Sequence, residues 1–238
     1  MRKLITAAVV AAASLALVGS AIADPNDDQA SLQVTASPKD AGTSKKPKNV
    51  KLTFGTKVNL PGTTVDTIQV LLPSGLKFSG KGFKKCNLDD LAAGGPTVCP
   101  SGSKAGPKGT ANALVGPANA PLNFDVYPFV GNSSTLYFYL DQDPVGVQSV
   151  VQGKITNSGR TMTITIPKEL RQPGGLDATL TGISQTFSGK AKKNYIVSST
   201  KCPKGSWKVG SKFTFATRVD GTPPPAPESR EVKVKCSK

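Results

Sequence analysis

The chain has 238 residues, of which 30 are lysine or arginine and 15 are aspartate or glutamate, so its formal net charge at neutral pH is +15. Histidine is absent, which excludes Ser-His-Asp and Cys-His catalysis and removes the commonest general base near neutral pH. So basic a chain is attracted to polyanions. Because lysine supplies nearly all of the positive charge and arginine is scarce, specific nucleic-acid recognition is not expected.

The first 23 residues predict a signal peptide. Arg2 and Lys3 precede an apolar stretch from Leu4 to Val18, and Ala21-Ile22-Ala23 supplies the small-x-small pattern cut by signal peptidase. The apolar stretch is shorter than the roughly 20 residues that span a bilayer. We expect cleavage after Ala23 and a mature chain without a transmembrane segment, either secreted or held extracytoplasmically in the cell envelope.

Residues 24–49 are expected to form a flexible N-terminal arm. Within it, Leu32, Val34 and Ala36 alternate with polar residues, which indicates an edge strand. Residues 50–238 are expected to form a disulfide-stapled β-sandwich, as one domain or as two lobes.

From Val50 onward, apolar and polar residues alternate with the period of two that is typical of half-buried strands. The clearest case is Thr161 to Ile166, where Met162, Ile164 and Ile166 share one face. Ten or so short strands between Gly- and Pro-rich turns predict an all-β fold, an immunoglobulin-like β-sandwich, with a β-barrel or a two-lobed sandwich as the alternative. The single tryptophan, Trp207, is expected in a turn beside Cys202.

Four cysteines in an exported chain indicate two disulfides. Three pairings are open, and we favour Cys86–Cys99 and Cys202–Cys236 because each closes a local loop. Between Cys86 and Cys99, the residues Asn87-Leu88-Asp89-Asp90-Leu91 predict one short helix with Asn87 as its N-cap. No Cys-x-x-Cys spacing accompanies the lack of histidine, so no zinc site is expected.

Two groups of residues other than lysines are candidates for chemistry. Asp141 and Asp143 could bind calcium or act in glycoside hydrolysis, although a turn before Pro144 explains them without any site. Tyr137 and Tyr139, with Tyr127 nearby, could stack on a glycan if their face is open, and belong to the core if it is covered. We favour the turn and the core, and assign no catalytic residue, cofactor or metal.

Lysine clusters flank the cysteine-containing turns. If these turns share one end of the fold, the clusters form a basic rim suited to an anionic envelope polymer, whereas scattered lysines would only keep the strands soluble. A further cluster lies at Lys190, Lys192 and Lys193. The residues predicted to contact a polyanion are Lys81, Lys84, Lys85, Lys201, Lys204 and Lys208.

Three short motifs are LPSGL from Leu72, CPSGSKAG from Cys99 and CPKGSW from Cys202. Together they resemble a set of exported actinobacterial proteins with the spelling LPxGL…C…CPxGSxxG and no established activity. The resemblance covers most of Leu72 to Cys236. It implies export, a β-sandwich and disulfides, and adds no site residue.

The sequence therefore predicts a secreted or envelope-associated, non-enzymatic protein with a structural or binding role. The alternative is a carbohydrate-active enzyme or glycan-binding module that uses Asp141, Asp143 and the tyrosines.

Overall fold

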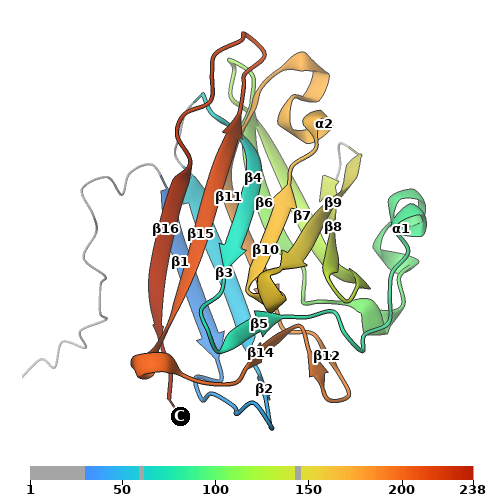
Figure 1. Ribbon diagram of the computed structural model, residues 1–238. Coiled ribbons are helices and arrows are strands. Elements are labelled where there is room, and N and C mark those ends of the chain that lie inside the picture. The colour runs from blue at the N-terminus through green and yellow to red at the C-terminus, as the bar shows by residue number, and fades with distance from the viewer. Residues whose placement is uncertain (1–29, 59–61, 143–145, 238) are drawn as a thin grey trace, which may run out of the picture.

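The computed structural model describes residues 30–58, 62–142 and 146–237. The predicted signal peptide (residues 1–23) and Asp143 lie outside these ranges. Most of the described chain forms one large sheet, in which every pairing is antiparallel (Figure 1). Its eleven strands, in their order across the sheet, are β1 (Ala30–Ser37), β3 (Lys51–Val58), β11 (Ala178–Phe187), β6 (Gly109–Val115), β7 (Ala120–Asn132), β8 (Thr135–Gln142), β9 (Val147–Thr156), β10 (Thr161–Thr165), β4 (Thr64–Leu71), β15 (Ser206–Ala216) and β16 (Glu228–Lys235).

The sheet comes close to closing on itself, because its two outermost strands, β1 and β16, lie side by side (Figure 1). Arg230 Nε on β16 donates to the Ala30 carbonyl on β1 at 2.9 Å. Beyond the strand ends, the Ala41 amide donates to the Ser237 carbonyl at 2.9 Å, and the Ser237 amide donates to the Lys39 carbonyl at 3.1 Å. These contacts hold the two edges of the sheet close to each other, so neither edge is as open as that of a flat sheet.

The alternation of side chains along each strand places an apolar set inside the curved sheet. On β10, Met162 is fully buried, and Ile164 packs against the same core while Thr165 is exposed. Other strands contribute in the same way. The interior residues include Leu52, Phe54, Ile68, Val70, Val126, Leu136, Phe138, Trp207, Val209 and Phe213.

Three short strands cover one end of the large sheet. They are β2 (Lys48–Asn49), β14 (Val197–Ser199) and β5 (Leu76–Phe78), with β14 in the middle. Phe78 of β5 meets Phe187 of β11 edge-on, with ring centroids 5.3 Å apart, and Phe187 meets Phe138 of β8 at 6.2 Å. This aromatic cluster closes the interior at that end. A small hairpin, β12 (Lys190–Ala191) and β13 (Asn194–Tyr195), lies beside it (Figure 1).

The short helix α2 (Lys168–Arg171) lies at the other end of the sheet (Figure 1). Its Arg171 Nη1 contacts the Asp66 carboxylate of β4 at 3.0 Å. The helix is followed by a 3-10 turn, Pro173–Gly175.

The excursion between β5 and β6 carries the first disulfide and the helix α1 (Leu88–Gly94). The Asn87 side chain accepts hydrogen bonds from the amides of Asp89 at 2.8 Å and Asp90 at 3.2 Å, which caps the helix. Leu91 and the disulfide pack on Phe129 and Tyr139. The excursion therefore forms a second, smaller core on the outer face of β7 and β8.

The structure confirms the all-β class, the capped helix between Cys86 and Cys99, and the strand expected around Leu32. It also confirms both disulfides, Cys86–Cys99 and Cys202–Cys236, whose Cα atoms are 5.1 and 5.8 Å apart. An immunoglobulin-like sandwich is not confirmed, because the long strands form a single nearly closed sheet instead of two facing ones. That arrangement is closer to the barrel alternative.

Two details differ from the sequence-based expectation. Trp207, expected in a turn, lies in β15 and is fully buried, and its Nε1 donates to the Lys201 carbonyl at 2.9 Å. The helix α2 is not predicted by the sequence, because its single turn is too short for a helical period to show. None of the helices in the described residues is long and apolar enough to cross a membrane.

Candidate functional site

All six lysines predicted to contact a polyanion are exposed. Lys81, Lys84 and Lys85 lie in the loop between β5 and α1. Lys201 and Lys204 lie between β14 and β15, and Lys208 lies in the first residues of β15. The two groups lie at opposite ends of β5. Lys201 contacts Gly75, just before the strand begins, whereas Lys81 follows Phe78, the last residue of the strand. The six lysines are therefore two separate groups.

The loop that carries Lys81, Lys84 and Lys85 is held to the fold at both of its ends. The amide of Ser79 donates to the Ile196 carbonyl at 3.0 Å, and the amide of Cys86 donates to the Val130 carbonyl at 2.8 Å. Between them, Phe83 is buried. Because Phe83 and Cys86 point inward, the three lysines extend into solvent.

Two other segments with lysines lie against this loop. A Cβ atom added at Gly82 would overlap the Asn194 side chain of the β12–β13 hairpin, so the loop backbone at Gly82 lies directly against this side chain. A Cβ added at Gly102 would lie 3.3 Å from Lys84 Cγ, which places the turn before Lys104 beside the same loop. The Gly189 amide donates to the Ala105 carbonyl at 2.9 Å and joins the hairpin to that turn.

We call the lysines of these three segments the basic surface. No aspartate or glutamate occurs in residues 79–86, 102–106 or 188–196, and all the lysines in them are exposed. None of them forms an ion pair with another described residue. The members of the basic surface are Lys81, Lys84, Lys85, Lys104, Lys190, Lys192 and Lys193.

Among the described residues, two lysines outside the basic surface form ion pairs. Lys108 Nζ lies 2.7 Å from Asp125 Oδ2, and the hydrogen bond and charge of Asp125 raise the pKa of Lys108. Lys208, one of the predicted residues, lies 3.4 Å from Glu231. The basic surface, in contrast, is a local concentration of uncompensated positive charge, which attracts polyanions.

The acidic candidates do not form a recognisable catalytic or metal site. Asp141 lies on β8 directly opposite Asp125 of β7, and its Oδ1 accepts a hydrogen bond from Gln148 Nε2 at 3.4 Å. Asp125 forms an ion pair with Lys108. Asp143 lies outside the described residues. In the part of the chain that the structure describes, no three His, Cys, Asp or Glu residues are grouped so that they could hold a metal ion.

The tyrosine face is partly covered. Tyr139 is 1% exposed beneath the α1 excursion, and its ring centroid lies 6.3 Å from that of Tyr127. Burial raises the pKa of Tyr139, and the negative charges of Asp141 and ionised Tyr127 add to the effect. Tyr127 and Tyr137 are partly buried. Tyr139 is thus a core residue and presents no free ring face to a glycan.

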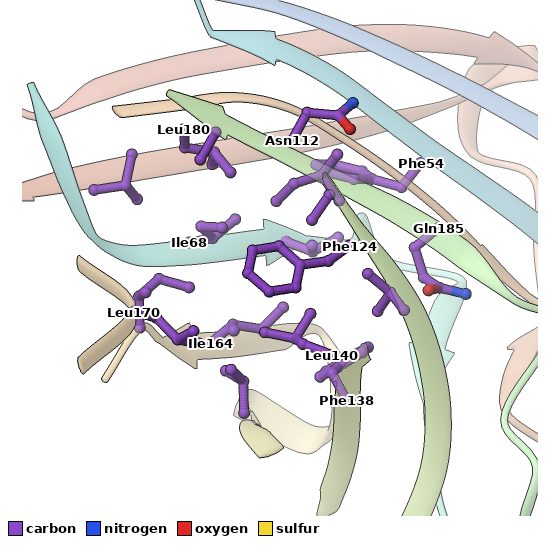
Figure 2. Close-up of a pocket in the computed structure, with 18 of the residues that line it drawn as sticks. Phe54, Ile68, Asn112, Phe124, Phe138, Leu140, Ile164, Leu170, Leu180 and Gln185 are labelled. Atoms are coloured by element: carbon purple, nitrogen blue, oxygen red, sulfur yellow. The ribbon is translucent and has the colours of Figure 1, made fainter. Parts of the chain in front are cut away.

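A cavity of about 120 Å³ lies inside the sheet (Figure 2). Its walls are almost entirely apolar, and it extends from Phe138 and Phe187 toward α2, which contributes Leu170 and Arg171. Figure 2 shows Phe124 between Leu170 on one side and Gln185 on the other. Among the described residues that line the cavity, Arg171 alone is charged.

Sequence reasoning missed Lys104 and the cavity. Lys104 lies in the turn after Cys99, which the sequence does show. That this turn lies beside Lys84, however, depends on how the excursion folds. The cavity is lined by residues from many strands, so no single segment carries a signal for it. No protein-family model, curated protein or solved structure matches this chain.

Proposed function

We propose that this protein is a non-enzymatic binding protein, secreted or held in the cell envelope, whose basic surface binds an anionic polymer of that envelope. The observation that carries this proposal is the basic surface itself, where exposed lysines of three adjoining segments lie together. None of the three segments contains an acidic residue, and none of these lysines forms an ion pair with another described residue. The two disulfides are compatible with an oxidising, extracytoplasmic setting.

Lysine suits a polymer better than a single small anion. Its ammonium group is a point charge on a flexible stem, without the planar fork by which arginine fixes one carboxylate or phosphate. A flexible chain of phosphates or carboxylates can reach several lysines at once. At anionic lipid surfaces each lysine contributes about 1 kcal/mol to binding, so several weak contacts add up to useful affinity.

The test is the retention of the full exported chain on immobilised poly(glycerol phosphate) teichoic acid over a salt series. A variant with Lys81, Lys84, Lys190 and Lys193 changed to Gln is compared with a control in which four exposed lysines elsewhere are changed to Gln. The control lysines are Lys51, Lys57, Lys168 and Lys233.

We expect the binding of the unmodified protein to weaken as salt rises, because such contacts are screened. The basic-surface variant should bind at least tenfold more weakly at low salt, while the control, with the same net charge, should stay close to the unmodified protein. Equal weakening of both variants would mean that only net charge matters. Binding whose strength does not change with the salt concentration would contradict the proposal directly.

The carbohydrate-active alternative makes a different prediction. It requires Asp141, with Asp143, to act on a glycan, so Asn at both positions would abolish activity on some glycan. The proposal expects the same double substitution to leave teichoic acid binding unchanged.

A further inference from the structure

The interior cavity is accessible from the α2 end of the sheet. Five apolar residues that line it, from β10, β11, α2 and the link between β10 and α2, are only partly buried although they face the interior. They are Ile164, Ile166, Leu170, Leu180 and Ile183. The cavity is partly open to solvent and not fully enclosed, and these partly exposed residues include those contributed by α2 and the link that leads to it. The cavity therefore has a mouth beside α2.

The far end of the cavity is closed. Phe138 and Phe187 line it there, and Phe78 of β5 packs behind Phe187 with its ring centroid 5.3 Å away. Phe78 is 1% exposed. The cavity is thus a blind apolar pocket with one entrance, the kind of site in which a small molecule with an apolar body is held.

Few polar side chains line the cavity, and two of them, Gln185 and Arg171, differ in whether they have a donor left for a ligand. Gln185 is 4% exposed, and its Nε2 donates to the carbonyls of Pro107 and Thr186, both at 3.0 Å, so its amide is fixed to the wall. Arg171 lies at the mouth, where Nη1 contacts Asp66. Its Nε is buried and has no hydrogen-bond partner among the described residues. The Arg171 side chain as a whole is 22% exposed, so the accessible part of its guanidinium group can meet an acceptor at the mouth.

We propose that this cavity binds a free alkyl carboxylate of medium chain length, with the hydrocarbon chain inside and the carboxylate at Arg171. An apolar wall selects a hydrocarbon, and a charged donor at the rim selects an anionic head group. The site is separate from the basic surface, which lies at the other end of the sheet, and its occupation does not depend on the function proposed above.

The cavity volume limits the chain. A cavity of about 150 Å³ with similar walls holds the six carbons of a benzene molecule, so the present 120 Å³ holds about five carbon atoms. Each methylene that enters the cavity should raise the affinity about fourfold. The gain should stop when the cavity is full, at a total chain length of about seven to eight carbons once the carboxylate and the carbons at the mouth are added.

The experiment measures dissociation constants of the full exported chain by equilibrium dialysis for the series from butanoate to dodecanoate, with 1-octanol as the uncharged counterpart of octanoate. We expect affinity to rise about fourfold per methylene up to octanoate and then to level off. A flat series, or one that rises without a plateau to dodecanoate, would overturn the proposal. This test needs no variant.

Variants then locate the ligand. Ala113→Leu fills part of the cavity and should weaken octanoate at least tenfold, while Thr110→Leu on the exposed face of the same strand should not. If Ala113→Leu lacks the far-UV circular dichroism of the parent, Ala111→Leu replaces it. Equal octanoate binding by the filled and control variants would refute the location.

The head-group position has its own test. Arg171→Gln should weaken octanoate about tenfold and leave 1-octanol unchanged, whereas Lys168→Gln, one turn earlier, should change neither. Equal loss for octanoate and octanol would give Arg171 a structural role only and overturn the carboxylate placement. The basic-surface variant should bind octanoate normally, which separates this proposal from the preceding one.

Discussion

Removing the second disulfide should cost more stability than removing the first. Cys202 and Cys236 are 34 positions apart, whereas Cys86 and Cys99 are 13 apart. A disulfide restricts the unfolded chain by an amount that grows with the logarithm of the loop it closes. For these loops the chain-entropy relation gives about 3.8 kcal/mol for Cys202–Cys236 and about 3.0 kcal/mol for Cys86–Cys99.

The structure adds a second reason for this order. Cys236 follows β16, which pairs with β15 and lies beside β1. Loss of the bond frees the end of the strand that brings the sheet close to closure. The first disulfide, in contrast, fastens an excursion on the outer face. A loss of about 4 kcal/mol is a large share of the 5–15 kcal/mol that stabilises a typical domain.

The assay is urea unfolding of the parent, of Cys202→Ala/Cys236→Ala and of Cys86→Ala/Cys99→Ala. Trp207, the single tryptophan, is fully buried in β15, so its fluorescence reports directly on the region near the second disulfide. Far-UV circular dichroism of the same samples reports on the whole sheet. The reasoning would be refuted if the Cys202/Cys236 variant unfolded at the parent's urea concentration, or if it were the more stable of the two variants.

Three further predictions concern single side chains. Met162→Ala should lower the free energy of unfolding by about 2–5 kcal/mol, because Met162 is fully buried, and Thr163→Ala on the opposite face should cost far less in the same urea assay. Asn87→Ala should cost about 1 kcal/mol by removing the cap of α1, while Asn87→Asp, which keeps an acceptor, should cost little. Tyr139 should titrate above the ordinary value near 10, because burial raises its pKa. The folded state then holds this proton more tightly than the unfolded state, so stability is fully present below pH 10 and falls as the pH rises through the raised pKa. In urea unfolding between pH 8 and 11.5, Tyr139→Phe should reduce that fall, and an unchanged profile would show that Tyr139 does not cause it.

Local patterns in the sequence predict the strands and the helix α1 well. The alternation of Met162 and Ile164 with threonines identifies the inner face of β10, and Asn87 identifies the start of α1. Loop length was enough to select the observed cysteine pairing. Alternation cannot tell whether two inner faces meet across a pair of sheets or around one curved sheet, so the sequence offers the nearly closed sheet only as the barrel alternative.

Trp207 illustrates a second limit. Its neighbours Lys204 and Gly205 form a turn, and the apolar alternation that begins at Trp207 and Val209 is interrupted by Ser211. Ser211 is fully buried, so a polar residue stands at an interior position. The pattern is therefore weaker than the strand it encodes, which is why the sequence predicts a turn at Trp207 where β15 has already begun.

The candidate sites depend on contacts between distant segments. The basic surface forms because Gly82 meets Asn194 and because Gly189 is hydrogen-bonded to Ala105. The sequence shows each lysine cluster, but not which clusters meet. From the sequence, Lys81 and Lys201 are predicted to belong to one contact surface. The structure places these two residues at opposite ends of β5.

The most direct test of the proposed function is a map of lysine reactivity in the free and the polymer-bound protein. Acetylation rates of individual lysines are measured by mass spectrometry with and without saturating poly(glycerol phosphate) teichoic acid at low salt. We predict slower acetylation of the lysines of the basic surface and unchanged rates at Lys51, Lys57 and Lys233. Uniform protection of all exposed lysines, or protection centred on Lys51, Lys57 and Lys233, would contradict the proposal that the basic surface binds the polymer.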